Sequence, residues 1–261
     1  MDAQESRKNG GTMKLDKCIY KGEKKSVYLE GGKAVKVFAK NYSKTDVLYE
    51  ALNTARVEDS GMDIPKLLEV SIVDGQWAIT SEYIEGENLS DLLRKNPGKT
   101  DAYLEKMVDY QLEINAKQNP LLNKLKDKLN RQINELGELD HSTKYELLTR
   151  LDSMPKHKKL CHGDFCPDNI IVDKDGKFHV VDWVHATQGN ASADVARTYL
   201  LLSLDFPALA DKYMDLFCEK TQTKKSYVQG WLPIVAAAQL GKHNPKEAPL
   251  LSKWMDVVDF Q

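Results

Sequence analysis

A block of polar residues between positions 160 and 183 has the types and spacing that phosphoryl-transfer chemistry requires. His162, Asp164 and Asn169 are spaced as H-x-D-x-x-x-x-N, and Asp182 follows Asn169 by thirteen residues. The amide oxygen of Asn169 and the carboxylate of Asp182 are hard oxygen ligands, which Mg²⁺ accepts together with phosphate and water. Asp164 would then hold an acceptor hydroxyl beside the metal-bound phosphate. We therefore predict Asp164 as the catalytic residue and Asn169 and Asp182 as metal ligands.

The sequence between these residues predicts a β-hairpin that brings the two metal ligands together. Residues 170–172 and 178–181 are strand-like, and the turn signal Asp-Lys-Asp-Gly at 173–176 separates them. Asn169 precedes the first strand and Asp182 follows the second, so both lie at the same end of the hairpin. The alternative is an ordinary strand entry, where Asp, Asn, Gly and Pro are common.

The N-terminal part of the chain predicts an antiparallel sheet with one helix. The helix is expected at 45–58, and the β-prone runs lie at 18–20, 27–29, 34–38, 67–73 and 76–81. Glycine-containing turns separate several of these runs, as hairpins require. Sequence character changes near residues 81–86, which predicts a boundary between two lobes.

The C-terminal part predicts a larger, mainly helical lobe, so the predicted fold class is α+β. One helical face is expected from apolar residues at spacings of three and four: Leu122, Leu125, Leu129, Ile133 and Leu136. Residues 143–146 predict a capping box at the start of a helix that ends near Met154.

Composition and charge exclude several classes of protein. The chain has 261 residues, with 37 Lys+Arg against 39 Asp+Glu and a formal net charge of −2. Neither a basic stripe for nucleic acid nor an apolar run of membrane-spanning length is present, so we expect no nucleic-acid or membrane partner. Four cysteines without paired spacing predict reduced thiols and a cytoplasmic location. A metal site built from Cys161, His162 and Cys166 is a weaker alternative.

The segment HGDFCPDNIIV, together with VVDW, resembles the catalytic block of the aminoglycoside phosphotransferase and choline kinase-like family, which has a protein-kinase-like fold. The Gly after His162, the Pro before Asp168-Asn169 and the Asp-Trp at 182–183 distinguish it from typical protein kinases. The resemblance implies a bilobal chain. A flexible leader at 1–12, with Met13 as an alternative start, would precede a nucleotide-binding lobe at 13–83. Residues 84–261 would form a lobe with the catalytic loop and the acceptor site.

The resemblance also implies a set of nucleotide-binding residues. Lys36 would contact the α- and β-phosphates, and Glu50 would be its ion-pair partner, with Asp46 and Glu58 as alternatives on the same predicted helix. Ser26 would approach a phosphate from the loop that begins at Lys21, although this loop lacks the pattern GxGxxG.

Further roles implied by the resemblance concern the lobe linker and the support of the catalytic loop. Backbone groups of Glu82 and Ile84 would pair with the nucleotide base. His162 and Asp194 would support the catalytic loop.

The function implied is transfer of the γ-phosphoryl group of ATP or GTP, with Mg²⁺, to a hydroxyl of a small molecule. An aminoglycoside-type antibiotic is the first expectation, which would make the chain an antibiotic-resistance enzyme. The alternatives are a metabolic alcohol such as choline, a sugar or an amino-alcohol, and a nucleotide-binding pseudokinase. A protein kinase is disfavoured because only eleven residues separate Asp182 from Asp194 and no Ala-Pro-Glu follows, which leaves no room for a peptide-docking segment.

Overall fold

The structure, a computed structural model, describes residue 15 and residues 17–255 and divides into two compact units. The first unit comprises the described residues up to Leu52 together with Pro65–Tyr83, and the second comprises Asn53–Ile64 and the described residues from Ile84 onward. The predicted leader at 1–12 and the alternative start at Met13 lie outside the described residues.

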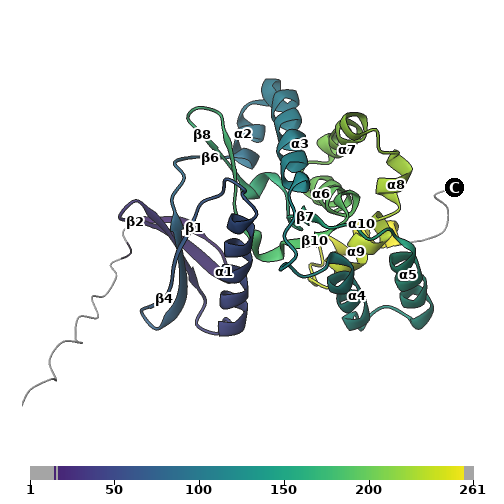
Figure 1. Cartoon of the computed structure of the whole chain (residues 1–261), viewed down its shortest axis with the longest axis horizontal. Coiled ribbons are helices and arrows are strands. Elements are labelled where there is room, and N and C mark those ends of the chain that lie inside the picture. The colour runs from purple at the N-terminus through teal and green to yellow at the C-terminus, as the bar shows by residue number, and fades with distance from the viewer. Residues whose placement is uncertain (1–14, 16, 256–261) are drawn as a thin grey trace, which may run out of the picture. The chain divides into compact units, whose positions relative to one another are not determined.

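The first unit is built on an antiparallel sheet (Figure 1). The sheet has five strands in the order β1-β2-β3-β5-β4. The strands are β1 (Lys17–Lys21), β2 (Lys25–Glu30), β3 (Lys33–Phe38), β4 (Leu67–Val73) and β5 (Gln76–Glu82). Helix α1 (Lys44–Asp59) begins in this unit and packs Val47 and Ala51 against Phe38 and Ile79 of the sheet. The predicted antiparallel sheet with one helix is confirmed.

The second unit is mainly helical, as predicted, and among its described helices none is long and apolar enough to cross a membrane. Its helices are α2 (Leu89–Lys95), α3 (Thr100–Ala116), α4 (Leu125–Glu135), α5 (His141–Ser153), α6 (Ala191–Asp205), α7 (Pro207–Thr221), α8 (Lys225–Gln229), α9 (Leu232–Leu240) and α10 (Ala248–Met255). Single 3₁₀ turns occur at Pro97–Lys99, Pro167–Asn169 and Trp183–His185.

Short strands of the second unit form two small sheets, and the loop at 162–169 connects one sheet to the other. They are β6 (Gly86–Asn88), β7 (Lys159–Cys161), β8 (Ile170–Asp173), β9 (Phe178–Val180) and β10 (Thr187–Gly189). Strands β6, β8 and β9 form one antiparallel sheet and β7 pairs with β10 in the other. Ile170 lies opposite Val180 in the β8–β9 hairpin, which confirms the predicted hairpin.

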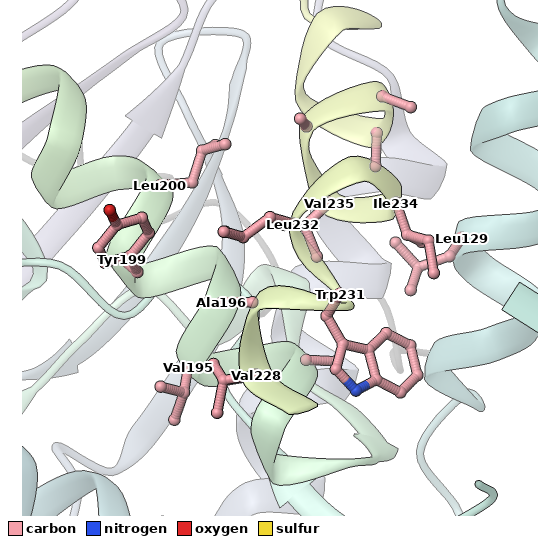
Figure 2. Packing of buried hydrophobic residues seen from close by; sticks show 14 of the residues in the cluster. Leu129, Val195, Ala196, Tyr199, Leu200, Val228, Trp231, Leu232, Ile234 and Val235 are labelled. Atoms are coloured by element: carbon pink, nitrogen blue, oxygen red, sulfur yellow. The ribbon is translucent and has the colours of Figure 1, made fainter. Parts of the chain in front are cut away.

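Helix α9 lies at the centre of the largest apolar core, between α6 and α4 (Figure 2). Its sequence LPIVAAAQL is buried from Leu232 to Gln239, and the run of three alanines allows neighbouring helices to approach closely. Trp231, directly before α9, is fully buried and belongs to the same apolar cluster as Leu129 of α4 (Figure 2). This core holds α6, whose first turn carries Asp194, the residue that accepts hydrogen bonds from the loop at 162–169.

The predicted capping box at 143–146 is wrong, because a stronger cap lies upstream. Asp140 is the N-cap of α5: its Oδ1 accepts from the backbone N–H of Thr143 at 2.9 Å, and its Oδ2 accepts from the Thr143 hydroxyl at 2.7 Å. An ionised side chain at this position accepts hydrogen bonds from the first free N–H groups of the helix. Its negative charge is also attracted to the positive end of the helix dipole. The helix therefore begins at His141.

The predicted helical face around Leu129 is only partly helical. Leu125, Leu129 and Ile133 lie within α4, whereas Leu122 precedes the helix and Leu136 is its C-cap. All five residues are nevertheless buried, so the apolar pattern extends beyond the helix that it predicted.

Replacing Trp231 with alanine should lower the free energy of unfolding by about 3–5 kcal/mol, because the removed indole leaves a cavity in the core. Chemical denaturation measures this loss. Tyr145→Ala is the control, because that side chain is 73% exposed and its loss should change stability by less than about 0.5 kcal/mol. Equal stability of the Trp231 variant and the control would contradict the position of this residue at the centre of the core.

Candidate active site

In the first unit, an ion pair joins the central strand β3 to helix α1. Lys36 Nζ donates to Glu50 Oε1 at 2.5 Å, and the two side chains are 19% and 6% exposed. Such burial strengthens the attraction between the charges and fixes the lysine side chain relative to the sheet. The structure therefore brings together the two residues that the sequence predicted as partners.

Ser26 is not brought together with Lys36. In the antiparallel pairing of β2 with β3, Ser26 lies opposite Val37, while Lys36 lies opposite Val27. Directly opposed side chains share one face of a sheet and neighbours along a strand alternate between faces, so Ser26 and Lys36 project from opposite faces. Ser26 lines a separate pocket of about 310 Å³ together with Val37 and other residues of the first unit.

The linker residues occupy the end of β5 and the start of the second unit. The backbone N–H of Glu82 donates to the carbonyl of Lys66 at 3.0 Å, and Glu82 Oε2 accepts from the N–H of Lys66 at 3.1 Å. Glu82 is thereby anchored to the chain that enters β4. Ile84 is the first residue of the second unit after this linker.

His162 connects the loop after β7 with the end of the hairpin. Its ring is fully buried, Nδ1 accepts from the backbone N–H of Asp164 at 3.2 Å, and Nε2 lies 3.1 Å from the carbonyl oxygen of Val181. Since Nδ1 accepts, the proton lies on Nε2 and is donated to Val181. Burial lowers the pKa of His162, although Asp194 and Asp164 oppose this effect, so the imidazole is neutral.

Asp194 holds the same loop from the first turn of α6. This carboxylate is only 2% exposed, and its Oδ1 accepts from the N–H of Gly163 at 2.7 Å. Its Oδ2 accepts from the N–H of His162 at 3.1 Å and from Nε2 of Gln111 at 3.3 Å. Charge-assisted hydrogen bonds and the positive end of the helix dipole compensate for the burial of this charge.

Asn169 lies between Asp164 and the residues around Asp182. Its Nδ2 donates to the carbonyl oxygen of Asp164 at 2.8 Å and to Asp164 Oδ2 at 3.3 Å, which directs the amide oxygen away from Asp164. The N–H of Val181 donates to the carbonyl of Asn169 at 3.0 Å. Asp182 follows directly, in the left-handed region with φ of 66°. The structure therefore brings Asp164, Asn169 and Asp182 together at one end of the hairpin.

The oxygen donors of Asn169 and Asp182 fit Mg²⁺ by type, since this ion is often bound by one or two protein oxygens with phosphate and water completing the octahedron. The weaker alternative with Cys161, His162 and Cys166 is not supported. Within residue 15 and residues 17–255, no three His, Cys, Asp or Glu side chains are grouped so as to hold a metal ion. Burial instead raises the pKa of the Cys161 thiol, as expected for an unreactive core cysteine.

Asp164 itself is surrounded by positive charge. Its Oδ1 lies 3.2 Å from Arg197 Nη2 and 3.7 Å from Lys242 Nζ, and its side chain is 23% exposed. Burial raises the pKa of Asp164, but the charges of Lys242 and Arg197 outweigh burial and lower it to about 2. Asp164 is therefore ionised at neutral pH.

A small pocket beside Asp164 contains residues that the sequence did not single out. Its volume is about 50 Å³. Its polar lining includes Asp194, which the sequence analysis named, and five residues that it did not: Lys128, Gln132, His185, Arg197 and Lys242. The ammonium group of Lys128 donates to the carbonyl of His185 at 3.3 Å. A lone arginine within the apolar sequence of α6 was the one available signal for Arg197.

Two of these groups have strongly altered pKa values. Burial, followed by repulsion from Arg197, lowers the pKa of Lys128 to about 8. Burial, followed by repulsion from Lys128, lowers the pKa of His185 to about 3, so that His185 is neutral. The pocket is therefore crowded with positive charge.

Comparison of the sequence with protein families gives one match. Residues 25–227 match the phosphotransferase enzyme family. The chain belongs to this family. A comparison with curated proteins finds no match.

Solved structures of similar fold agree with this membership. A thermostable mutant of aminoglycoside phosphotransferase APH(4)-Ia, in a ternary complex with AMP-PNP and hygromycin B, is 16% identical with a TM-score of 0.72, covering 95% of this chain and 94% of that chain. A choline/ethanolamine kinase family protein from Mesorhizobium loti is 15% identical with a TM-score of 0.64, covering 96% and 91%. Choline kinase LicA from Streptococcus pneumoniae is 16% identical with a TM-score of 0.62, covering 89% of each chain. These likenesses confirm the kinase-like fold of the phosphotransferase.

The loop at 162–169 requires glycine at position 163, where φ is 78° and an added Cβ would lie 2.6 Å from the carbonyl oxygen of His185. Gly163→Ala should therefore lower the free energy of unfolding by about 1–3 kcal/mol more than a glycine-to-alanine change without a clash. Gly176→Ala is the matched control, since its φ is 76° and the nearest atom is the flexible end of Lys106 at 3.6 Å. If urea denaturation shows the same loss of unfolding free energy for Gly163→Ala and Gly176→Ala, His185 does not constrain the loop.

Proposed function

We propose that this phosphotransferase moves the γ-phosphoryl group of ATP or GTP, with Mg²⁺, onto a hydroxyl group of a small molecule. The observation that carries the proposal is the arrangement at the end of the hairpin. There the Asn169 side chain donates to the carbonyl of Asp164, and the backbone carbonyl of Asn169 accepts from Val181, the residue before Asp182. Family membership supports phosphoryl transfer as the reaction class. Phosphoryl transfer depends mainly on positioning and electrostatic stabilisation, and a rigid set of polar residues supplies both.

The proposed nucleotide contacts come from the first unit and the linker. Lys36, held by Glu50, would bind the α- and β-phosphates as a fixed positive charge. The carbonyl of Glu82 and the N–H of Ile84 would pair with the base. Ser26 is left out of the proposed set because it projects from the other face of the sheet. The complexes of APH(4)-Ia with AMP-PNP support a nucleotide as donor.

Asn169 and Asp182 are the residues proposed to hold Mg²⁺, which would neutralise phosphate charge when bound. Asp164 would accept a hydrogen bond from the acceptor hydroxyl, orient its oxygen toward the phosphorus, and take the proton late in the reaction. His162 and Asp194 are proposed to support the loop rather than to touch the substrate, since both are engaged with backbone groups of that loop.

The acceptor is proposed to be a small molecule. Hygromycin B is bound in the APH(4)-Ia complex, and two other similar structures are a choline kinase and a choline/ethanolamine kinase family protein. An aminoglycoside-type antibiotic and a metabolic alcohol are therefore the first classes to assay. The eleven residues between Asp182 and Asp194 argue against a peptide acceptor.

Asp164→Asn should lower turnover by roughly 10²–10⁴-fold while nucleotide affinity stays unchanged, because only the group that orients the acceptor and takes its proton is altered. Phosphate transfer from Mg-ATP and Mg-GTP would be measured across aminoglycosides, alcohols, sugars, hydroxy acids and a peptide. Asp168→Asn is the matched control on the same loop, where the side chain is exposed. Full turnover in the Asp164 variant would refute its role, and nucleotide binding without any transfer would favour a pseudokinase.

Asp182→Asn should weaken Mg²⁺-dependent nucleotide binding by at least about tenfold, since one ligand charge is lost. Asparagine tolerates the left-handed backbone at this position, so the substitution adds little strain. Nucleotide affinity would be titrated with and without Mg²⁺, with the exposed turn residue changed in Asp175→Asn as control. An unchanged response of the Asp182 variant to Mg²⁺ would remove this residue from the metal site.

A further inference from the structure

The pocket beside Asp164 holds three basic side chains that come from separate parts of the second unit. Lys128 lies on α4, Arg197 on α6, and Lys242 directly after Gly241, the residue that caps α9. Arg197 Nη2 and Lys242 Nζ lie 3.2 Å and 3.7 Å from Asp164 Oδ1, and all three basic residues line the same small cavity. The positive charge therefore lies beside the group proposed to hold the acceptor hydroxyl.

The carboxylates in and beside the pocket do not balance this charge. Asp164 is shared between Arg197 and Lys242, and the oxygens of Asp194 accept from the N–H groups of His162 and Gly163 and from Gln111. His185 is neutral, as its lowered pKa indicates, and contributes no charge. Glu247, whose charge also acts on Lys242, accepts from the side-chain amides of Gln239 and Asn244. The three basic groups thus face carboxylates that are either shared or already engaged with other donors.

Arg197 has hydrogen-bonding capacity that the described part of the chain does not use. Its side chain is 9% exposed, and its buried Nε has no hydrogen-bond partner among the described residues. A buried donor without a partner is costly, so such a group indicates a missing partner. The planar arrangement of guanidinium donors matches the oxygens of a carboxylate or a phosphate.

We propose that the acceptor carries an anionic group (a carboxylate, phosphate or sulfate) close to its reactive hydroxyl, and that Lys128, Arg197 and Lys242 bind this group. This inference rests on the proposed function and deepens it. The hydroxyl and the anionic group would be separated by only a few bonds, because Arg197 and Lys242 both contact Asp164. The cavity of about 50 Å³ exceeds the roughly 10–15 Å³ that one water requires, so it has room for a small polar group.

This proposal disfavours the aminoglycoside expectation. A polycationic antibiotic would bring more positive charge to a site where burial, followed by repulsion from Arg197, already lowers the pKa of Lys128. Like charges at close range repel strongly in a partly buried site, whereas an anion relieves the repulsion among the three basic groups.

The test is direct binding of matched compounds to the full chain saturated with Mg-AMP-PNP, measured by calorimetry. The first series compares the anions glycerate and glycerol 3-phosphate with neutral glycerol and cationic serinol. The second compares the anions gluconate and glucose 6-phosphate with neutral glucose and cationic glucosamine. Kanamycin serves as the polycation. In at least one series the anions should bind about tenfold or more tightly than the neutral parent, because each charge-assisted hydrogen bond favours them. Equal or tighter binding of the neutral or cationic compounds, or no anion binding in either series, would overturn the proposal.

The same binding measurements are repeated with the nucleotide-free protein. Anions that bind only without Mg-AMP-PNP and are displaced by it would show that the basic residues serve the nucleotide phosphates, which would also overturn the proposal. Binding that persists in the presence of Mg-AMP-PNP and weakens with added salt supports it.

Lys128→Gln should weaken binding of the anions by about tenfold and leave binding of the neutral compounds unchanged, since one charged donor is lost. Lys124→Gln is the matched control, with the same change of charge at an exposed residue four positions earlier. Thermal denaturation of both variants checks the fold. Equal anion affinity of the two variants would remove Lys128 from the site.

Binding and turnover separate this inference from the proposed function. Anion binding without phosphate transfer to any compound would refute the function while leaving the anion site in place. Efficient transfer to a neutral or cationic acceptor would confirm a phosphotransferase and refute the anionic acceptor.

Discussion

The organisation of the loop at 162–169 depends on one buried carboxylate, that of Asp194. Its oxygens accept from the consecutive N–H groups of His162 and Gly163, at 3.1 and 2.7 Å, in a position that is 2% exposed. A buried charge persists only where hydrogen bonds and local dipoles replace water, so this carboxylate and the loop amides require one another. Because Asp194 belongs to α6, which packs against α9 in the main core, the position of the loop is set by the packing of the helices.

From this anchor, hydrogen bonds extend to Asp164, to Asn169 and to Val181, the residue before Asp182. Neutral His162 joins the N–H of Asp164 to the carbonyl of Val181, and Asn169 binds Asp164 from the other side. Each of these hydrogen bonds joins a side chain to a backbone group. The side chains of His162 and Asn169 therefore fix the path of the loop as well as their own orientation. Catalysis by positioning needs this rigidity, because small displacements of the reacting groups cost large factors in rate.

The features that sequence predicted are those encoded by local patterns. The spacing of His162, Asp164 and Asn169, the hairpin and the strand lysine are each readable within a few residues, and the structure contains them. Ser26 could not be placed in the same way, because its face depends on the register between β2 and β3. The basic residues around Asp164 were missed for a related reason. They converge from α4, α6 and the segment after α9, and each one alone resembles a surface charge or an isolated core arginine.

This convergence bears on how Asp164 could receive a hydroxyl group. Its Oδ1 is held by Arg197 and Lys242, and its Oδ2 is contacted by Asn169, so an incoming hydroxyl must share an oxygen that already accepts from another donor. An acceptor with its own anionic group would draw Arg197 and Lys242 toward itself and relax their hold on Oδ1. A cationic acceptor would instead compete with both for the same carboxylate. The charge of the acceptor and the availability of Asp164 are therefore linked through the same two side chains, and an anionic hydroxyl compound satisfies both requirements together.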